Sequence, residues 1–246
     1  NVVKRWRQPG YLTDLLGEYN TYSTERSDTN QFLYFSKTRK QVTKGWKPPT
    51  TTLNLTFPEF LILANQTQDT IGGTHYYFQT MACGEYKKGD CKGDKNNTPR
   101  LEKLKDELPF FLPPSEYVIE PDQQKGRMHC KFSSRGVFAP AHFDSPRNFL
   151  VVLEGQRRYV LPKPNQYGSL YVYPATHPSS RHSQVDWTAP DVTSFPKFAN
   201  AKATQIVLNA GDLLFIPPRW FHAIISLSEG LNIQCNTWSG SKAQKT

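Results

Sequence analysis

Residues 211–224 read GDLLFIPPRWFHAI. The stretch opens with a glycine–aspartate pair that is typical of a turn, and the apolar residues 213–216 then predict a short strand. A second turn is expected at Pro217-Pro218, and His222 stands where the next strand begins. Turns this close together leave room for strands of only a few residues. The stretch therefore indicates a sheet protein rather than a helical one.

The same alternation of strands and turns runs through the second half of the chain. Turn residues such as Gly155 separate short apolar runs, which favours an antiparallel sandwich or barrel. One long proline-rich excursion, residues 167–202, interrupts the strands. We expect it to act as a lid over a substrate site, because a loop of this length in a compact domain is usually functional. The predicted strands are residues 128–133, 148–153, 157–161, 205–208, 213–216, 223–227 and 232–238.

The first half of the chain is predicted to mix short helices with irregular segments. Residues 12–19 carry leucines and a tyrosine at helical spacing, and residues 98–108 repeat that pattern between two prolines. Thr56 and Glu59 have the spacing of a capping box, with a proline between them, so a further helix is expected from there to residue 64. These helices are expected to pack on the sheets rather than to form a unit of their own.

Length and composition are those of a folded globule. The chain has 246 residues, of which 37% are hydrophobic and 13% aromatic. No run approaches about 18 apolar residues, so no membrane span is expected. We predict one domain, residues 1–246, in which a helical and mixed part, residues 1–127, packs on a β core, residues 128–240.

Charge restricts the partners only loosely. The formal net charge of +9 favours acidic partners or polyanions, but the basic residues are scattered and form no block. A solvated basic surface is favoured over a dedicated nucleic-acid groove by about two to one. Residues 1–8 are polar and basic and lack the apolar stretch of a secretory signal, so a cytoplasmic or nuclear location is expected.

The four cysteines do not form a metal motif. No Cys-x-x-Cys pair occurs, so a structural zinc site is not expected. Cys83 and Cys91 flank a polar loop and are placed to form a local disulfide in an oxidising compartment. Cys130 and Cys235 lie in apolar strand-like runs and are predicted to be ordinary buried thiols. This pattern favours a reducing compartment.

A His-x-Asp pair at His142 and Asp144 is the main candidate for chemistry. Alternate residues of a strand point the same way, so both side chains are expected on one face. His222, on a second strand, is placed to join them. Two histidines and one carboxylate on one side of a metal leave the other side open, as non-haem iron(II) oxygenases require.

Together these motifs resemble the cupin or Jumonji-C superfamily over residues 77–240. The resemblance implies a mainly β fold with flanking helices, the double-stranded β-helix or jelly roll. Within the superfamily the chain is similar, over nearly its whole length, to the asparaginyl hydroxylases typified by factor inhibiting HIF. The shared segments include PAHFD at residues 140–144, NF at 148–149, SQVD at 183–186, FPKF at 195–198 and NTW at 236–238.

The resemblance implies a dioxygenase that uses iron(II), 2-oxoglutarate and dioxygen. His142, Asp144 and His222 would be both the metal ligands and the catalytic residues. Four further residues match positions that bind the cosubstrate in the family: Tyr77, Asn148, Arg157 and Asn236.

Arg157 matches the family lysine that anchors the distal carboxylate of 2-oxoglutarate. An arginine grips a carboxylate bidentately, but it is larger than lysine. In a regular strand its neighbour Arg158 points the other way. Tyr77 matches a tyrosine that hydrogen-bonds the same carboxylate, while Ala139 replaces a threonine that touches the cosubstrate.

The substrate groove implied by the resemblance departs from the family pattern. His182 stands where the family has a glutamine that contacts the substrate amide, so weak activity on asparagine peptides is expected. Dimerising helices follow the family core, and whether this chain forms a homodimer is left open. The residues expected to line the groove are Tyr34, Gln79, Arg181, His182 and Trp238.

Three functions remain open at this point. The first is hydroxylation of a protein side chain, in an ankyrin-repeat or transcription-factor segment. The second is hydroxylation of RNA, because a tRNA wybutosine hydroxylase shares the Jumonji-C core and the net charge is basic. The third is a non-catalytic cupin binding module, which an intact ligand triad disfavours.

Overall fold

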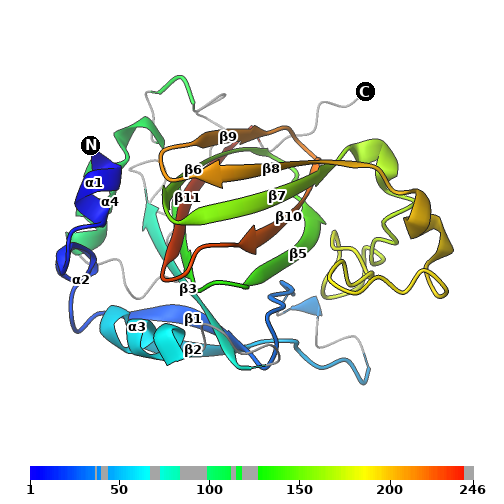
Figure 1. The fold of residues 1–246 in the computed structure, drawn as a ribbon, viewed down its shortest axis with the longest axis horizontal. Helices are drawn as coiled ribbons and strands as arrows, with labels where there is room; N and C mark the ends of the chain where they lie inside the picture. Colours follow the sequence, from blue (N-terminus) through cyan, green and yellow to red (C-terminus); the bar gives the residue numbers. More distant parts are fainter. Residues whose placement is uncertain are drawn as a thin grey trace.

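The chain folds into two antiparallel sheets that face each other (Figure 1). The computed structural model describes residues 1–36, 38–39, 44–66, 73–83, 99–111, 115–117 and 127–240. A seven-stranded sheet has the order β2-β1-β3-β4-β11-β6-β9, and a four-stranded sheet has the order β5-β10-β7-β8. This arrangement confirms the predicted jelly roll. The strands are β1 Thr21–Ser27, β2 Thr51–Thr56, β3 His75–Cys83, β4 Arg127–Ser133, β5 Phe138–Phe143, β6 Arg147–Glu154, β7 Gln156–Pro162, β8 Ala203–Asn209, β9 Leu213–Ile216, β10 Phe221–Ser226 and β11 Asn232–Ser239.

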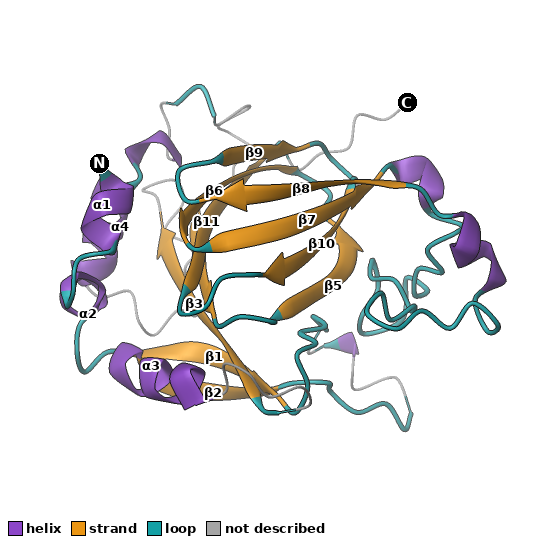
Figure 2. Ribbon diagram, in the orientation of Figure 1, coloured by secondary structure: helices purple, strands orange, loops and turns teal. Residues whose placement is uncertain are grey.

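In the described part of the chain, the four α-helices pack against the seven-stranded sheet (Figure 2). The predicted capping box is present: the Thr56 backbone N–H donates to the Glu59 carboxylate at 2.7 Å, and Glu59 N–H donates to the Thr56 hydroxyl at 3.3 Å. The helix predicted for residues 12–19 is shorter than expected, because Gly17 ends it with a φ of 86°. The helices are α1 Val2–Trp6, α2 Tyr11–Leu16, α3 Phe57–Gln66 and α4 Pro99–Glu107, with 3-10 turns η2 Pro109–Phe111, η4 Pro164–Gln166 and η5 Pro196–Asn200.

The expectation that the first half is helical and irregular was incomplete. Strands β1, β2 and β3 lie there and extend the large sheet, with β3 pairing directly to β4 of the core. Strand β2 is rich in threonine and has no buried residue, so it lacks the apolar alternation that marks a half-buried strand. Strand β5 was missing from the predicted strand ranges, although His142 and Asp144 were expected on a strand; it contains His142 but ends one residue before Asp144.

A large apolar core fills the space between the seven-stranded sheet and the helices. Phe78 and Phe132 from the sheet pack against Phe57 and Phe60 with ring centroids 5.0 to 5.6 Å apart. Trp6 of α1 stacks on Phe132 at 6.3 Å. The core therefore holds the helical part against the outer face of the seven-stranded sheet, on the side away from the small sheet.

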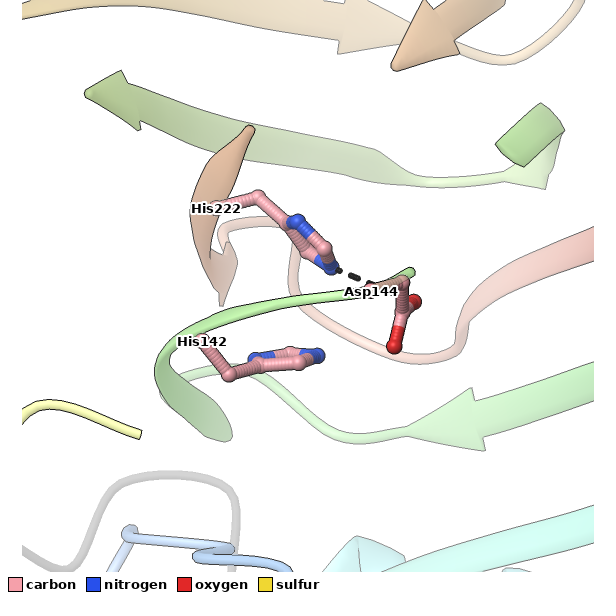
Figure 3. Close-up of side chains that lie close together, drawn as sticks. All are labelled: His142, Asp144 and His222. Carbon is pink, nitrogen blue, oxygen red and sulfur yellow. Dashed lines mark ion pairs between the residues drawn. The ribbon is translucent and has the colours of Figure 1, made fainter. Parts of the chain in front are cut away.

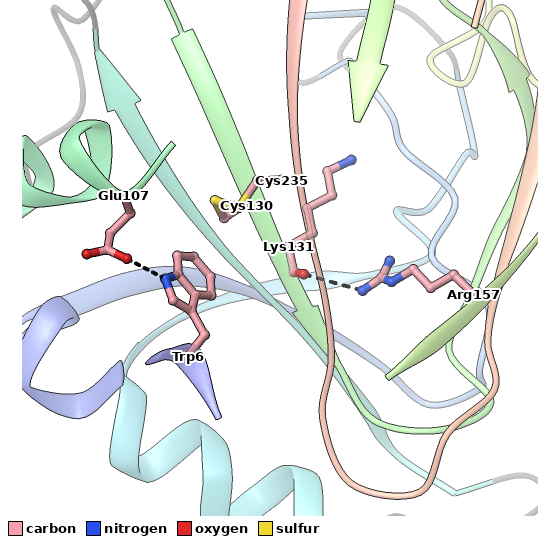
Figure 4. Close-up of a disulfide and its surroundings, with 6 residues drawn as sticks. All are labelled: Trp6, Glu107, Cys130, Lys131, Arg157 and Cys235. Carbon is pink, nitrogen blue, oxygen red and sulfur yellow. Dashed lines mark hydrogen bonds between the residues drawn. A yellow bond between two sulfur atoms is a disulfide. The ribbon is translucent and has the colours of Figure 1, made fainter. Parts of the chain in front are cut away.

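Glu107 at the end of α4 ties the N-terminal helices together. Its carboxylate accepts hydrogen bonds from the Arg5 guanidinium at 2.8 Å, the Trp6 indole at 3.1 Å and the Tyr11 hydroxyl at 2.6 Å. Figure 4 shows the Trp6 bond. Because these donors come from α1 and α2, one carboxylate fixes two helices to a third.

Cys130 and Cys235 form a disulfide, so the prediction that they are ordinary thiols was wrong. They are Cα partners in the β4–β11 register, and both are fully buried (Figure 4). Alternation along each strand predicts burial but cannot reveal which residues of two strands lie opposite each other. The predicted disulfide between Cys83 and Cys91 stays a prediction, since Cys91 lies outside the described residues.

The long excursion between β7 and β8 contains no strand of the two sheets. Two isolated bridges, His142 with His182 and Val172 with Ser183, attach its middle to the end of β5 and to itself. Figure 1 places the excursion at the opposite end of the long axis from α1 and α2. None of the described helices is long and apolar enough to cross a membrane.

Candidate metal centre

His142, Asp144 and His222 converge at one end of the small sheet (Figure 3). His142 lies on β5 and His222 on β10, where they are direct Cα partners with ring centroids 4.2 Å apart. Asp144 follows the last residue of β5. One candidate ligand atom from each side chain lies within 4.8 Å of the others, so the predicted triad is assembled.

Both imidazoles are held by backbone carbonyls. Nδ1 of His142 lies 2.8 Å from the Pro140 carbonyl, and Nδ1 of His222 lies 3.2 Å from the Trp220 carbonyl. A carbonyl only accepts, so Nδ1 carries the proton in each ring and Nε2 keeps its lone pair. Burial lowers the pKa of both histidines, which keeps them neutral and able to bind a cation.

Asp144 is held as an anion by two other side chains. Its Oδ1 accepts from Arg181 Nη1 at 3.0 Å, and its Oδ2 accepts from the Trp238 indole at 3.0 Å. Burial alone would raise the pKa of Asp144, but His142, His222 and Arg181 together lower it well below its usual range. Arg181 and Trp238, which were expected to line a substrate groove, therefore position a candidate metal ligand.

The donor set fits iron(II). Two neutral imidazole nitrogens and one carboxylate are the donors of the non-haem iron(II) oxygenases, and they reach the centre from two neighbouring strands. The Nδ1–carbonyl bonds supply the orienting contacts that metal-bound histidines normally make. His142, Asp144 and His222 would be the residues that hold the metal.

Polar side chains of the two sheets face each other in the space between them, here called the barrel interior. Arg157, which is 1% exposed, reaches across it from β7. Its Nη2 donates to the Asn232 carbonyl at 2.7 Å and to the Ser133 hydroxyl at 3.1 Å. Its Nη1 donates to Gln234 Oε1 at 3.2 Å. Arg157, the predicted anchor of the cosubstrate carboxylate, therefore already donates hydrogen bonds to acceptors of the large sheet.

The other predicted cosubstrate residues also face the barrel interior or its rim. Asn236 donates from Nδ2 to Asn148 Oδ1 at 3.1 Å, and its own Oδ1 is buried without a partner. Tyr77 is buried against Phe32. The orphaned amide oxygen of Asn236 leaves hydrogen-bonding capacity for a polar ligand.

The predicted substrate residues Tyr34 and His182 stack toward the metal centre. The His182 ring lies 4.8 Å from His142 at an interplanar angle of 17°, and the Tyr34 ring lies 6.2 Å from His182. Tyr34 is 62% exposed, so this aromatic stack runs from the surface to His142, a candidate metal ligand. Gln79 lies opposite Lys131 in the β3–β4 register.

Lys131 was not predicted as a site residue. It lies on β4 between Cys130 and Phe132, both fully buried in the apolar core, so alternation turns its side chain toward the barrel interior. Its charge acts on Asp144 and on His222. A lysine between two apolar residues of a predicted strand, Cys130 and Phe132, was the signal that could have revealed it.

Acid should destabilise the metal-free protein through its buried histidines. Burial lowers the pKa of His182 to about 4, whereas the unfolded chain titrates at about 6.5. The stability that this group contributes is therefore complete above about pH 6.5 and falls as the pH drops toward 4. Between about pH 7.5 and 5, the free energy of unfolding of the wild type should fall by on the order of 2 kcal/mol more than that of His182→Gln. Urea midpoints at the two pH values measure this, and equal losses would contradict it.

Comparison with known proteins gives a family match over nearly the whole chain. The cupin-like domain family matches residues 1–244. The chain is 34% identical over 99 residues to the JmjC domain-containing protein D of Dictyostelium discoideum, covering 40% of this chain and 22% of that protein. It is 32% identical over 176 residues to the tRNA wybutosine-synthesizing protein 5 of Danio rerio, covering 72% of this chain and 47% of that protein.

A third relative is the lysine-specific demethylase JMJ31 of Arabidopsis thaliana. It is 35% identical over 99 residues, which cover 39% of this chain and 18% of that protein. The chain thus spans less than half the length of each of these three relatives. They are similar to this chain over part of their length, and the names of two of them, the tRNA wybutosine-synthesizing protein and the lysine-specific demethylase, refer to different substrates.

Proposed function

Because this chain belongs to the cupin-like domain family, we propose that it is an iron(II)- and 2-oxoglutarate-dependent dioxygenase that hydroxylates a protein side chain. The observation that carries the reaction class is the convergence of His142, Asp144 and His222 with their Nε2 and carboxylate atoms turned to one centre. An intact set of three metal-binding side chains disfavours a binding module without catalysis.

Iron(II) would activate dioxygen, with one oxygen atom entering the substrate C–H bond and the other entering 2-oxoglutarate, which leaves as succinate and carbon dioxide. The protein's own residues do the positioning. Arg181 and Trp238 hold Asp144 in place, and the carbonyls of Pro140 and Trp220 hold the two rings. Polar groups of the barrel interior would receive the cosubstrate, and the stacked ring of His182 shields one side of the centre from water.

A protein substrate is supported by relatives and by the open end of the site. The lysine-specific demethylases of Arabidopsis and Xenopus tropicalis share the domain. Tyr34 is exposed beside His182, so an extended peptide has an aromatic surface to lie on next to the metal centre. Segments of ankyrin repeats or transcription factors, as the asparaginyl hydroxylases use, are the first peptides to try.

RNA is the second candidate substrate. The tRNA wybutosine-synthesizing protein of Danio rerio aligns with 72% of this chain, and the formal net charge of +9 favours a polyanion. The exposed ring of Tyr34, stacked toward His182, also has the geometry on which a nucleobase packs.

Succinate release separates the two substrates. The protein is supplied with iron(II), ascorbate and 2-oxoglutarate, and either a peptide pool or an RNA pool is added. We expect peptides to stimulate succinate release over the uncoupled rate, with a modest dependence on salt. Stimulation by RNA alone, with a steep loss of affinity as salt rises, would replace the protein substrate by RNA. Tyr34→Ala should lower stimulation by the true substrate while leaving the uncoupled rate unchanged.

A further inference from the structure

Among the residues that the structure describes, Lys131 and Arg157 both enter the barrel interior, and they do so from opposite sheets. Lys131 projects from β4 with its Nζ 5.8 Å from the centre of the Tyr77 ring, and its charge acts on Asp144 and His222. Arg157 projects from β7 in the opposite sheet. In Figure 4 the side chain of Lys131 extends away from the Arg157 guanidinium, so the two positive charges lie in different parts of the interior.

Arg157 is committed to joining the two sheets. Its guanidinium donates to Gln234, Asn232 and Ser133, and to the backbone carbonyl of Lys131 at 3.3 Å, all in the large sheet. Only its Nε is buried without a partner. To grip a carboxylate with two nitrogens, Arg157 would have to release acceptors that would then be buried and unpaired.

Lys131 has no such commitment. It makes no ion pair with any carboxylate in the described part of the chain, and it is only partly buried. The Lys131 ammonium group lies beside the Tyr77 ring in a polar interior. It is therefore placed to bind an anionic ligand, which would offset the cost of removing its charge from water. A long flexible stem lets an ammonium group adjust to the ligand's position.

We propose that Lys131, and not Arg157, provides the cation that binds the distal carboxylate of 2-oxoglutarate, with Tyr77 as its hydrogen-bonding neighbour. The role rests on the proposed function. It moves the anchor from β7 in the small sheet to β4 in the large sheet, and it assigns Arg157 to holding the two sheets together. Lys131 thereby selects 2-oxo acids that carry a second carboxylate.

Ligand binding to the manganese(II)-loaded protein tests the assignment without turnover. Two ligands of equal chain length are compared by calorimetry: 2-oxoglutarate, and 2-oxopentanoate, which has a methyl group in place of the distal carboxylate. The wild type should prefer 2-oxoglutarate. Lys131→Met should weaken 2-oxoglutarate binding roughly 10- to 100-fold, the usual effect of losing a hydrogen bond to a charged group. Its binding of 2-oxopentanoate should change by about threefold or less.

Three further variants make the result specific. Lys131→Arg should restore most of the preference, because the charge is kept. Arg158→Gln is the matched control, since Arg158 is exposed on the other face of β7. Arg157→Met should lower the urea midpoint, but its folded fraction should still prefer 2-oxoglutarate.

Each other outcome overturns a stated part of the proposal. If Lys131→Met keeps the wild-type preference and Arg157→Met loses it, the anchor is Arg157. If the wild type binds manganese(II) but does not distinguish the two 2-oxo acids, the proposed function fails and the role of Lys131 fails with it. If manganese(II) itself does not bind, the metal centre is refuted first.

Discussion

His142→Ala should abolish iron-dependent turnover of 2-oxoglutarate while the protein stays folded. The ring of His142 supplies one of three ligand atoms, and a methyl group cannot replace its Nε2. Contacts that merely orient a ligand are worth about 10- to 100-fold in metal affinity or activity, so losing a ligand should cost more than about 100-fold. Succinate formation measures the loss, and manganese(II) affinity should fall in parallel.

His177→Ala is the matched control for this experiment. His177 stacks on Tyr173 in the excursion and is not among the grouped ligands. It should keep the uncoupled rate of 2-oxoglutarate turnover. A folded His142→Ala protein with unchanged turnover would show that the triad does not hold the working metal.

Removing the disulfide should have the largest effect on stability. Cys130 and Cys235 are separated by 105 residues, and closing a loop of that length lowers the entropy of the unfolded chain. The double variant Cys130→Ala/Cys235→Ala should therefore be less stable than the oxidised wild type by about 4 kcal/mol. Urea denaturation without reductant measures the difference.

Reductant provides the internal control. It should lower the urea midpoint of the wild type and leave that of the double variant unchanged. Equal wild-type midpoints with and without reductant would contradict a stabilising bridge. The same comparison on protein taken directly from cells would test the expected cytoplasmic or nuclear location, because disulfides are uncommon in reducing compartments.

The sequence predicted the parts of the fold that depend on local pattern. Seven core strands and the Thr56–Glu59 capping box follow from alternation and spacing, and the structure contains them. The triad was predicted because His142, Asp144 and His222 stand in recognisable turns and strands. The predicted division of the chain into one domain of two parts stays a prediction.

Contacts that depend on the register between two strands could not be predicted from the sequence alone. The opposition of Cys130 and Cys235 is set by the pairing of β4 with β11. The same pairing brings the Ser133 hydroxyl and the Asn232 carbonyl to Arg157, which looks like a free anchor when its strand is considered alone. Lys131 became a candidate only when its neighbours were seen to face the other way.

The bond from Arg181 to Asp144 connects the excursion to the candidate metal centre. Arg181 belongs to the excursion between β7 and β8, and it is held at a φ of 75°, a backbone conformation that arginine seldom adopts. A macromolecule that docks on the excursion and relaxes this turn would pull on the carboxylate at the same time. Docking on the excursion would then be coupled, through a single guanidinium, to the position of a candidate metal ligand.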